Sequence, residues 1–195
     1  MKRELRFFET ELEIRTSDED NTITVAGMAV PYGQASNIDD ILVEEFRSGV
    51  FGDTVKGANI ALQLQHNNLA GPFARTGSKT LTLTDKKDGL YFRAKLDTRD
   101  PAVQSLAVQL ERRDIHGVSP GFARARSNWK NLPDGKLHRE IYEARLFEIS
   151  LTHNPAYEQT YAELRSEGLA ALKRPAPPSA FPRHLFLGVN STSQE

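Results

Sequence analysis

The sequence contains no cysteine, and this absence excludes several kinds of chemistry. Disulfide bonds, thiolate zinc sites and cysteine nucleophiles all depend on that side chain. A run of about 18 apolar residues, the length that a membrane-spanning helix needs, is also missing. The first residues, MKRELRFFETELEIR, carry charges where a signal peptide has its apolar stretch. We therefore expect synthesis in the cytoplasm and no membrane as a partner.

The chain lacks an excess of charge of either sign. Its 25 lysine and arginine residues stand against 26 aspartate and glutamate residues, which leaves a net charge of -1. Without a basic field, nucleic acid is not an expected partner. The length of 195 residues fits one domain followed by a tail.

Several common enzyme signatures are missing as well. The sequence has no phosphate-binding G-x-x-x-x-G-K-[ST], dinucleotide-binding G-x-G-x-x-G, zinc-binding H-E-x-x-H or hydrolase G-x-S-x-G motif. Its histidines show no spacing typical of metal ligands. We therefore expect neither a metal nor another cofactor.

Strand patterns dominate the first half of the chain. Apolar and polar residues alternate over residues 5–15, 22–30 and 60–66, and the acidic SDEDN segment joins the first two strands into a hairpin. The Asp-Gly pair in TLTLTDKKDGLYFRAKL predicts a second hairpin. Between the hairpins we expect a loop that starts at Pro31 and a short helix around residues 48–56.

A change of period marks a helix in the middle of the chain. Asp100 is a good N-cap and Pro101 a good first helical residue. Apolar residues then recur at three- and four-residue spacing through AVQSLAVQLERRD, which predicts an amphipathic helix. Beyond it we expect strands over residues 118–129 and 137–152, joined by a Pro-Asp-Gly turn, and a helix over residues 156–172.

The last segment is rich in proline, with Pro175, Pro177, Pro178 and Pro182 close together. This composition predicts a flexible tail over residues 173–195. The segments before it indicate an α+β fold, and strand-rich segments with hairpin turns favour a mainly antiparallel sheet or barrel.

Ser119 is a candidate nucleophile in the segment HGVSPGF. Gly117 and Gly121 on either side allow close approach of a substrate, and nearby amides could bind an oxyanion. Taken alone, a plain turn serine explains the segment better, because turns are rich in serine, glycine and proline.

His66 is a candidate base, because it ends an alternating strand at the polar boundary QLQHNN. The sequence has four other histidines, His116, His138, His153 and His184. A single histidine is more often a surface or satisfied structural residue than a functional one, so position alone does not distinguish His66 from them.

Glu148 interrupts the apolar run RLFEISLTHNPA. On a strand, Leu146, Glu148 and Ser150 share one face, while Phe147, Ile149 and Leu151 share the other. If the second face packs in the core, Glu148 points at solvent or into a cleft. Taken alone, an ordinary solvated edge glutamate explains this position better.

Taken in order, these segments resemble the prohead proteases of tailed phages, of the HK97-like type. The resemblance runs from about Thr22 to Tyr157 and consists of ITVAGMAVPYG, EEFRSGVF, the strand ending in LQHN, DGLYFRAKL, the helix, HGVSPGF and LFEISLTHNPA. One such segment would say little, whereas the ordered set at these spacings is specific.

The resemblance implies a fold, a domain division and an active site. The family is similar to the herpesvirus assemblins, which implies a small β-barrel with surrounding helices. Residues 1–172 would form the prohead protease domain. Carried over residue by residue, Ser119 is the nucleophile, His66 the general base and Glu148 the third member of a triad.

The oxyanion donors are affected by Pro120, which follows the implied nucleophile. Proline has no N–H, so residue 120 cannot donate to an oxyanion. Gly121, or a water held by Arg124, would have to serve instead.

The resemblance also implies a role. The chain would be a serine endopeptidase that cleaves the scaffold domain of the major capsid protein, and itself, inside the immature prohead in the bacterial host cytoplasm. Its partners would be the major capsid protein and, in a homo-oligomer, further copies of the chain. Two alternatives stay open: a non-catalytic head-assembly or scaffold protein with the same fold, and a small-molecule esterase or an unrelated β-barrel binding module.

Overall fold

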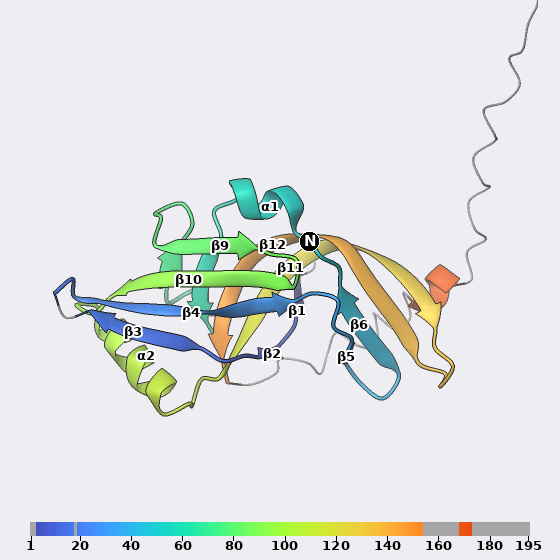
Figure 1. Cartoon of the computed structure of the whole chain (residues 1–195), viewed down its shortest axis with the longest axis horizontal. Helices are drawn as coiled ribbons and strands as arrows, with labels where there is room; N and C mark the ends of the chain where they lie inside the picture. The colour runs from blue at the N-terminus through green and yellow to red at the C-terminus, as the bar shows by residue number, and fades with distance from the viewer. Residues whose placement is uncertain (1–2, 18, 154–167, 173–195) are drawn as a thin grey trace, which may run out of the picture.

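The computed structural model describes residues 3–17, 19–153 and 168–172. These residues form two β-sheets, the helices α1 and α2, and a short helical segment at residues 168–172 (Figure 1). In chain order the elements are β1 (Glu4–Leu5), β2 (Phe8–Glu9), β3 (Glu13–Ser17), β4 (Thr22–Pro31), β5 (Ser36–Asn37), β6 (Leu42–Phe46), α1 (Gly52–Gly57), β7 (Ala61–Leu64), β8 (Ala74–Arg75), β9 (Leu81–Asp85), β10 (Gly89–Asp97), α2 (Pro101–Glu111), β11 (Gly117–Asn131) and β12 (Leu137–Thr152).

The smaller sheet has four strands in the order β3-β4-β10-β9, and all its pairings are antiparallel. The larger sheet is built on the long antiparallel hairpin of β11 and β12. Strands β6 and β7 both run parallel to β12 and lie end to end along its other edge. In Figure 1 this hairpin arches behind the smaller sheet, with α1 above and α2 below.

Apolar side chains from both sheets and from α2 form one main core. Helix α2 begins where the sequence predicts, because the Asp100 side chain accepts a hydrogen bond of 2.9 Å from the N–H of Ala102. Val103, Leu106 and Leu110 on its inner face are buried in that core. Within the described ranges, no helix is both long and apolar enough to cross a membrane.

Much of the predicted secondary structure is confirmed. Both hairpins form, as β3–β4 and β9–β10, and the short and the amphipathic helices appear as α1 and α2. The strand-rich part of the α+β prediction is also confirmed, since the described residues form mostly strands and few helices. The closed barrel is not confirmed, because in the described part of the chain the strand pairings form two separate open sheets.

The prediction of one continuous strand over residues 5–15 is wrong. The chain instead forms β1 and β2 against β11 in the larger sheet, and then crosses to form β3 against β4 in the smaller sheet. The interruption between β1 and β2 lies opposite Ser119 and Pro120, and Pro120 has no backbone N–H to offer to a neighbouring strand.

Strand β6 replaces part of the loop that was expected after Pro31. Its sequence, LVEEF, gave no two-residue alternation because Leu42, Val43 and Glu44 are all buried. Alternation of apolar and polar residues predicts only strands with one solvent-exposed face. A strand that is buried on both faces, such as β6, does not show this pattern.

A β-bulge overturns part of the predicted face assignment of β12. Ile149 and Leu151 lie in the core as expected, but so does Leu146, whereas Phe147 is only half-buried. The register runs from the Gly121–Glu148 pair directly to the Phe122–Leu146 pair, so Phe147 is the extra residue. An inserted residue reverses the alternation on one side of the bulge.

The predicted helix over residues 156–172 falls mostly outside the described residues. Within that range the structure describes residues 168–172, and these are helical. The predicted tail over residues 173–195 lies outside them altogether, so the division at residue 172 stays a prediction.

Three buried charged side chains and the half-buried Glu4 connect the N-terminal segment to β6 and β12. Arg6 contacts Glu44 on β6 at 2.5 and 2.8 Å, and Arg139 on β12 contacts Glu44 at 3.0 Å and Glu4 at 2.6 Å. Burial alone would raise the pKa of Glu4, but the hydrogen bond and charge of Arg139, followed by those of Arg6, lower it. The contribution of Glu4 to stability is therefore present above the ordinary carboxyl pKa and is lost as the pH falls through the lowered value.

We predict that Glu44→Gln lowers the free energy of unfolding by about 3–5 kcal/mol, because it leaves two buried guanidinium groups short of a carboxylate. Urea denaturation followed by circular dichroism measures the effect. The control is Glu143→Gln, which breaks the Arg126–Glu143 pair whose side chains are 66% and 60% exposed. That change is expected to cost less than about 1 kcal/mol, and equal losses in the two variants would contradict the prediction.

Candidate active site

Ser119, Glu148 and Ser150 lie on one face of the larger sheet. The register pairs Ser119 on β11 with Ser150 on β12, and Ser150 with Gln63 on β7. Partners opposite each other in a ladder place their side chains on the same face. The side chains of Ser119, Ser150 and Gln63 therefore form a row across β11, β12 and β7. Gly121 and Glu148 form the neighbouring row. The opposite face carries Ile149 and Leu151, which pack in the core.

His66 reaches this face through a turn that immediately follows β7. The predicted strand over residues 60–66 ends early, at Leu64, because Gln65 and His66 have φ angles of 50° and 57°. Two consecutive non-glycine residues in this left-handed region are unusual, and each carries some conformational strain. Hydrogen bonds hold the turn, from Gln65 N to Leu151 O at 3.0 Å and from Asn67 N to Leu64 O at 3.0 Å.

The His66 ring lies between the side chains of Ser119 and Glu148. Its Nε2 is 2.8 Å from Ser119 Oγ, and its Nδ1 is 2.5 Å from Glu148 Oε1. Ser119 and Glu148 are each 3% exposed, whereas the His66 side chain is 17% exposed. The three residues whose roles the sequence suggested are therefore brought together, although they come from distant parts of the chain.

The carboxylate determines which ring nitrogen of His66 carries the proton. An ionised carboxylate can only accept hydrogen bonds, so the Nδ1 that faces Glu148 must be the donor. In the neutral ring, Nε2 then has a free lone pair and accepts the Ser119 hydroxyl proton. This polarity is the one that a serine nucleophile with a histidine base requires.

Two further residues shape the surroundings of Glu148. A side chain at Gly121 would overlap the Glu148 carboxylate, so only glycine allows this carboxylate to lie against β11. The Ser150 hydroxyl donates to the other carboxylate oxygen, Oε2, at 3.2 Å. Glu148 is thus an enclosed carboxylate, and the solvated position considered from the sequence is wrong.

The strand before Ser119 also depends on a glycine. A side chain at Gly117 would overlap the Phe7 ring, which therefore lies over Gly117 on the face that carries Ser119. The same ring contacts His116 edge-on at 5.9 Å between centroids. The two glycines that flank Ser119 in HGVSPGF thus admit a carboxylate on one side and an aromatic ring on the other.

Comparison with known proteins gives the family of the chain. A family model described as "Caudovirus prohead serine protease" matches residues 10–175. The chain belongs to this family. It is also 28% identical over 169 residues to the "Prohead protease" of Enterobacteria phage HK97, an alignment that covers 87% of this chain and 68% of that protein. No solved structure matches the chain.

Membership of the prohead serine protease family makes the chain a serine peptidase of tailed phages. The resemblance to this family that the ordered sequence segments suggested is confirmed. The further similarity to herpesvirus assemblins stays a prediction, as do the individual catalytic roles of Ser119, His66 and Glu148.

The suggested oxyanion residues are placed less favourably than the other three. Gly121 lies within β11, which is flanked there by β1 and β12, so its N–H lies in the plane of the sheet. Arg124 lies farther along β11 at a bulge, with a φ of 54°, and lines a hollow formed by residues 49–54 and 142–145. Ser119 is not among the residues that line that hollow. The oxyanion roles of Gly121 and Arg124 stay predictions.

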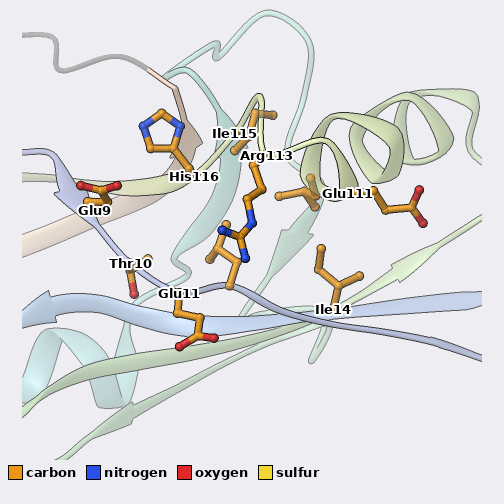
Figure 2. A pocket seen from close by; sticks show the side chains of 10 residues that line it. Glu9, Thr10, Glu11, Ile14, Glu111, Arg113, Ile115 and His116 are labelled. Carbon is orange, nitrogen blue, oxygen red and sulfur yellow. The ribbon is translucent and has the colours of Figure 1, made fainter.

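The other described histidines lie outside this cluster. His138 is buried and contacts Glu45 at 3.3 Å, and His153 contacts Gln65 at 2.6 Å. His116 lines a cavity of about 740 Å³ between the N-terminal segment and the end of α2, into which Arg113 extends (Figure 2). Ser119, His66 and Glu148 are not among its lining residues. His184 lies outside the described residues.

Sequence reasoning missed the part that Ser150 plays. Alternation placed it on the same face as Glu148, which was a correct signal, but a serine in a strand has no distinguishing pattern. Its full burial and its contact with His66 depend on the turn after β7, which alternation does not detect.

We predict that Gly121→Ala reduces peptide hydrolysis on the order of 100-fold, because displacing a catalytic group by about 1 Å has an effect of this size. The added methyl group would push the Glu148 carboxylate away from His66. Gly57→Ala is the matched control, since a side chain there would meet nothing within 4 Å. Thermal melting must show that both variants fold, and unchanged hydrolysis by folded Gly121→Ala would contradict the prediction.

Proposed function

We propose that the chain is an endopeptidase in which Ser119 is the nucleophile, His66 the general base and Glu148 the residue that orients His66. One observation carries the proposal: a continuous series of contacts from Ser119 Oγ through both nitrogens of His66 to Glu148 Oε1, with distances of 2.8 and 2.5 Å. The chain order His–Ser–Glu differs from that of well-known serine proteases, but a triad is defined by geometry and roles.

The first half of the reaction forms an acyl-enzyme. Nε2 of His66 takes the Ser119 hydroxyl proton as Oγ attacks the carbonyl carbon of the scissile peptide bond. The protonated imidazole then donates this proton to the leaving amine, and the peptide C–N bond breaks. Glu148 accepts the Nδ1–H bond throughout and stabilises the imidazolium while it exists.

The second half releases the product. His66 removes a proton from a water molecule, which attacks the acyl-enzyme ester, and returns the proton to Ser119 Oγ as the ester bond breaks. The partial exposure of the His66 ring leaves a path for this water, whereas Ser119 and Glu148 are enclosed.

The proposed substrate is the scaffold domain of the major capsid protein, which the enzyme cuts inside the immature prohead in the host cytoplasm. Membership of the prohead serine protease family supports this assignment. The major capsid protein is accordingly the expected partner, and further copies of the chain are expected to share the shell with it.

We predict that Ser119→Ala and His66→Ala each reduce cleavage at least about 10⁴-fold, and that Glu148→Gln reduces it less than either. The measurement is mass spectrometry of the major capsid protein of the same phage after co-expression with each variant. Ser78→Ala, which removes an exposed turn hydroxyl, is the matched control and should cleave normally. Processing of capsid protein by folded Ser119→Ala would disprove the assignment.

We also predict self-cleavage within the proline-rich segment over residues 173–195 when the enzyme is active. Intact-mass analysis of the purified chain should show a shortened C-terminus in the unmodified protein and a complete one in Ser119→Ala. Identical masses for the two C-termini would count against self-cleavage without affecting the capsid substrate.

A further inference from the structure

Ser150 connects His66 and Glu148, the two proposed partners of the nucleophile. Its Oγ accepts a hydrogen bond from the backbone N–H of His66 at 3.1 Å and donates one to Glu148 Oε2 at 3.2 Å. Ser150 is fully buried, with 0% of its surface exposed. The single hydroxyl group of Ser150 is therefore used once as an acceptor and once as a donor.

From these contacts we propose that Ser150 is a positioning residue that fixes His66 and Glu148 relative to each other. This inference rests on the proposed function of Ser119, His66 and Glu148. Ser150 contacts both residues of the pair formed by His66 Nδ1 and Glu148 Oε1. It binds the backbone N–H of His66 and the second carboxylate oxygen of Glu148, Oε2.

The first effect concerns the strained turn. His66 holds a φ of 57°, so its backbone can relax unless neighbouring groups restrain it. The N–H of His66 is restrained by Ser150, which belongs to the middle strand of the sheet and is fixed by pairing with β11 and β7. The hydroxyl thus transmits the rigidity of β12 to the residue that carries the base.

The second effect concerns the carboxylate. Glu148 Oε1 faces the His66 ring, and Oε2 receives the Ser150 hydroxyl. With both oxygens engaged, rotation of the carboxylate would break a hydrogen bond in an enclosed site, where an unpaired polar group costs about 1–3 kcal/mol. Ser150 therefore holds the carboxylate in the orientation that keeps Oε1 on Nδ1.

Ser150 is not an alternative nucleophile. Its Oγ contacts the backbone N–H of His66, whereas the ring nitrogen Nε2 faces Ser119 Oγ. The Ser150 residue has no exposed surface and its Oγ already accepts the His66 N–H, so this oxygen is not open to the carbonyl carbon of a substrate.

The test compares Ser150→Ala, Ser150→Thr and Ser127→Ala in the full chain. Threonine keeps the hydroxyl group, and a β-branched residue suits a strand. Ser127 is the matched control because it is a hydrogen-bonded serine of the same sheet, accepting from Arg139 Nε at 2.9 Å, and belongs to the buried charge network. Thermal melting of each variant shows whether it folds.

Two readouts report the activity of the site. The first is the rate at which a fluorophosphonate probe labels Ser119, read by intact mass. The second is the separate measurement of kcat and KM on a peptide that spans the cleavage site found in the co-expression experiment. We expect Ser150→Ala to lower the labelling rate and kcat by about 10- to 100-fold with little change in KM, Ser150→Thr to restore most of both, and Ser127→Ala to alter only the melting temperature.

The outcomes separate this inference from the proposed function. If folded Ser119→Ala is still active, the proposed function fails first. If Ser119→Ala is inactive while folded Ser150→Ala labels and cleaves at the unmodified rate, the positioning role is wrong. It is also wrong if Ser150→Thr is as impaired as Ser150→Ala while folded, or if KM rises and kcat does not fall. If Ser150→Ala does not fold, Ser150→Thr decides. Activity of Ser150→Thr close to that of the unmodified chain supports the positioning role, and a folded but strongly impaired Ser150→Thr contradicts it.

Discussion

Strand β12 is hydrogen-bonded along both of its edges, and the candidate active site depends on this pairing. One edge holds β11 and the other holds β6 and β7. The nucleophile candidate therefore lies on one side of β12 and the turn with His66 on the other, while Glu148 and Ser150 belong to β12 itself. A residue in the middle of a paired sheet has little freedom to move, so the three strands provide a rigid base for the four side chains.

The positions of Ser119, His66 and Glu148 could be suggested from the sequence because each belongs to a segment with a recognisable pattern. Alternation located their strands, and an ordered set of segments identified the family. The contacts between them could not be derived in this way. The β7–β12 pairing is parallel and joins segments distant in sequence, and the turn at Gln65 and His66 has no glycine to indicate a positive φ.

The errors in the fold have a common physical origin. Leu42 to Glu44 and the bulge at Phe147 both depart from two-residue alternation, the first because every side chain is buried and the second because of one inserted residue. Buried charges add to the difficulty, since Arg6, Glu44 and Arg139 look like surface residues in a sequence. Their burial becomes understandable only when the opposite charges are seen to meet in the larger sheet.

The N-terminal segment has a consequence for how a peptide can reach Ser119. Many proteins bind an extended peptide by letting it join the open edge of a sheet, so that the backbone supplies most of the hydrogen bonds. On either side of Ser119 that edge of β11 is already occupied, by β2 at Gly117 and Val118 and by β1 at Gly121 and Phe122, and Glu4 of β1 is held there by its ion pair with Arg139. An incoming peptide therefore finds no continuous free edge of β11 to join next to Ser119. Recognition of a peptide at this edge then depends on contacts with side chains more than on added strand hydrogen bonds.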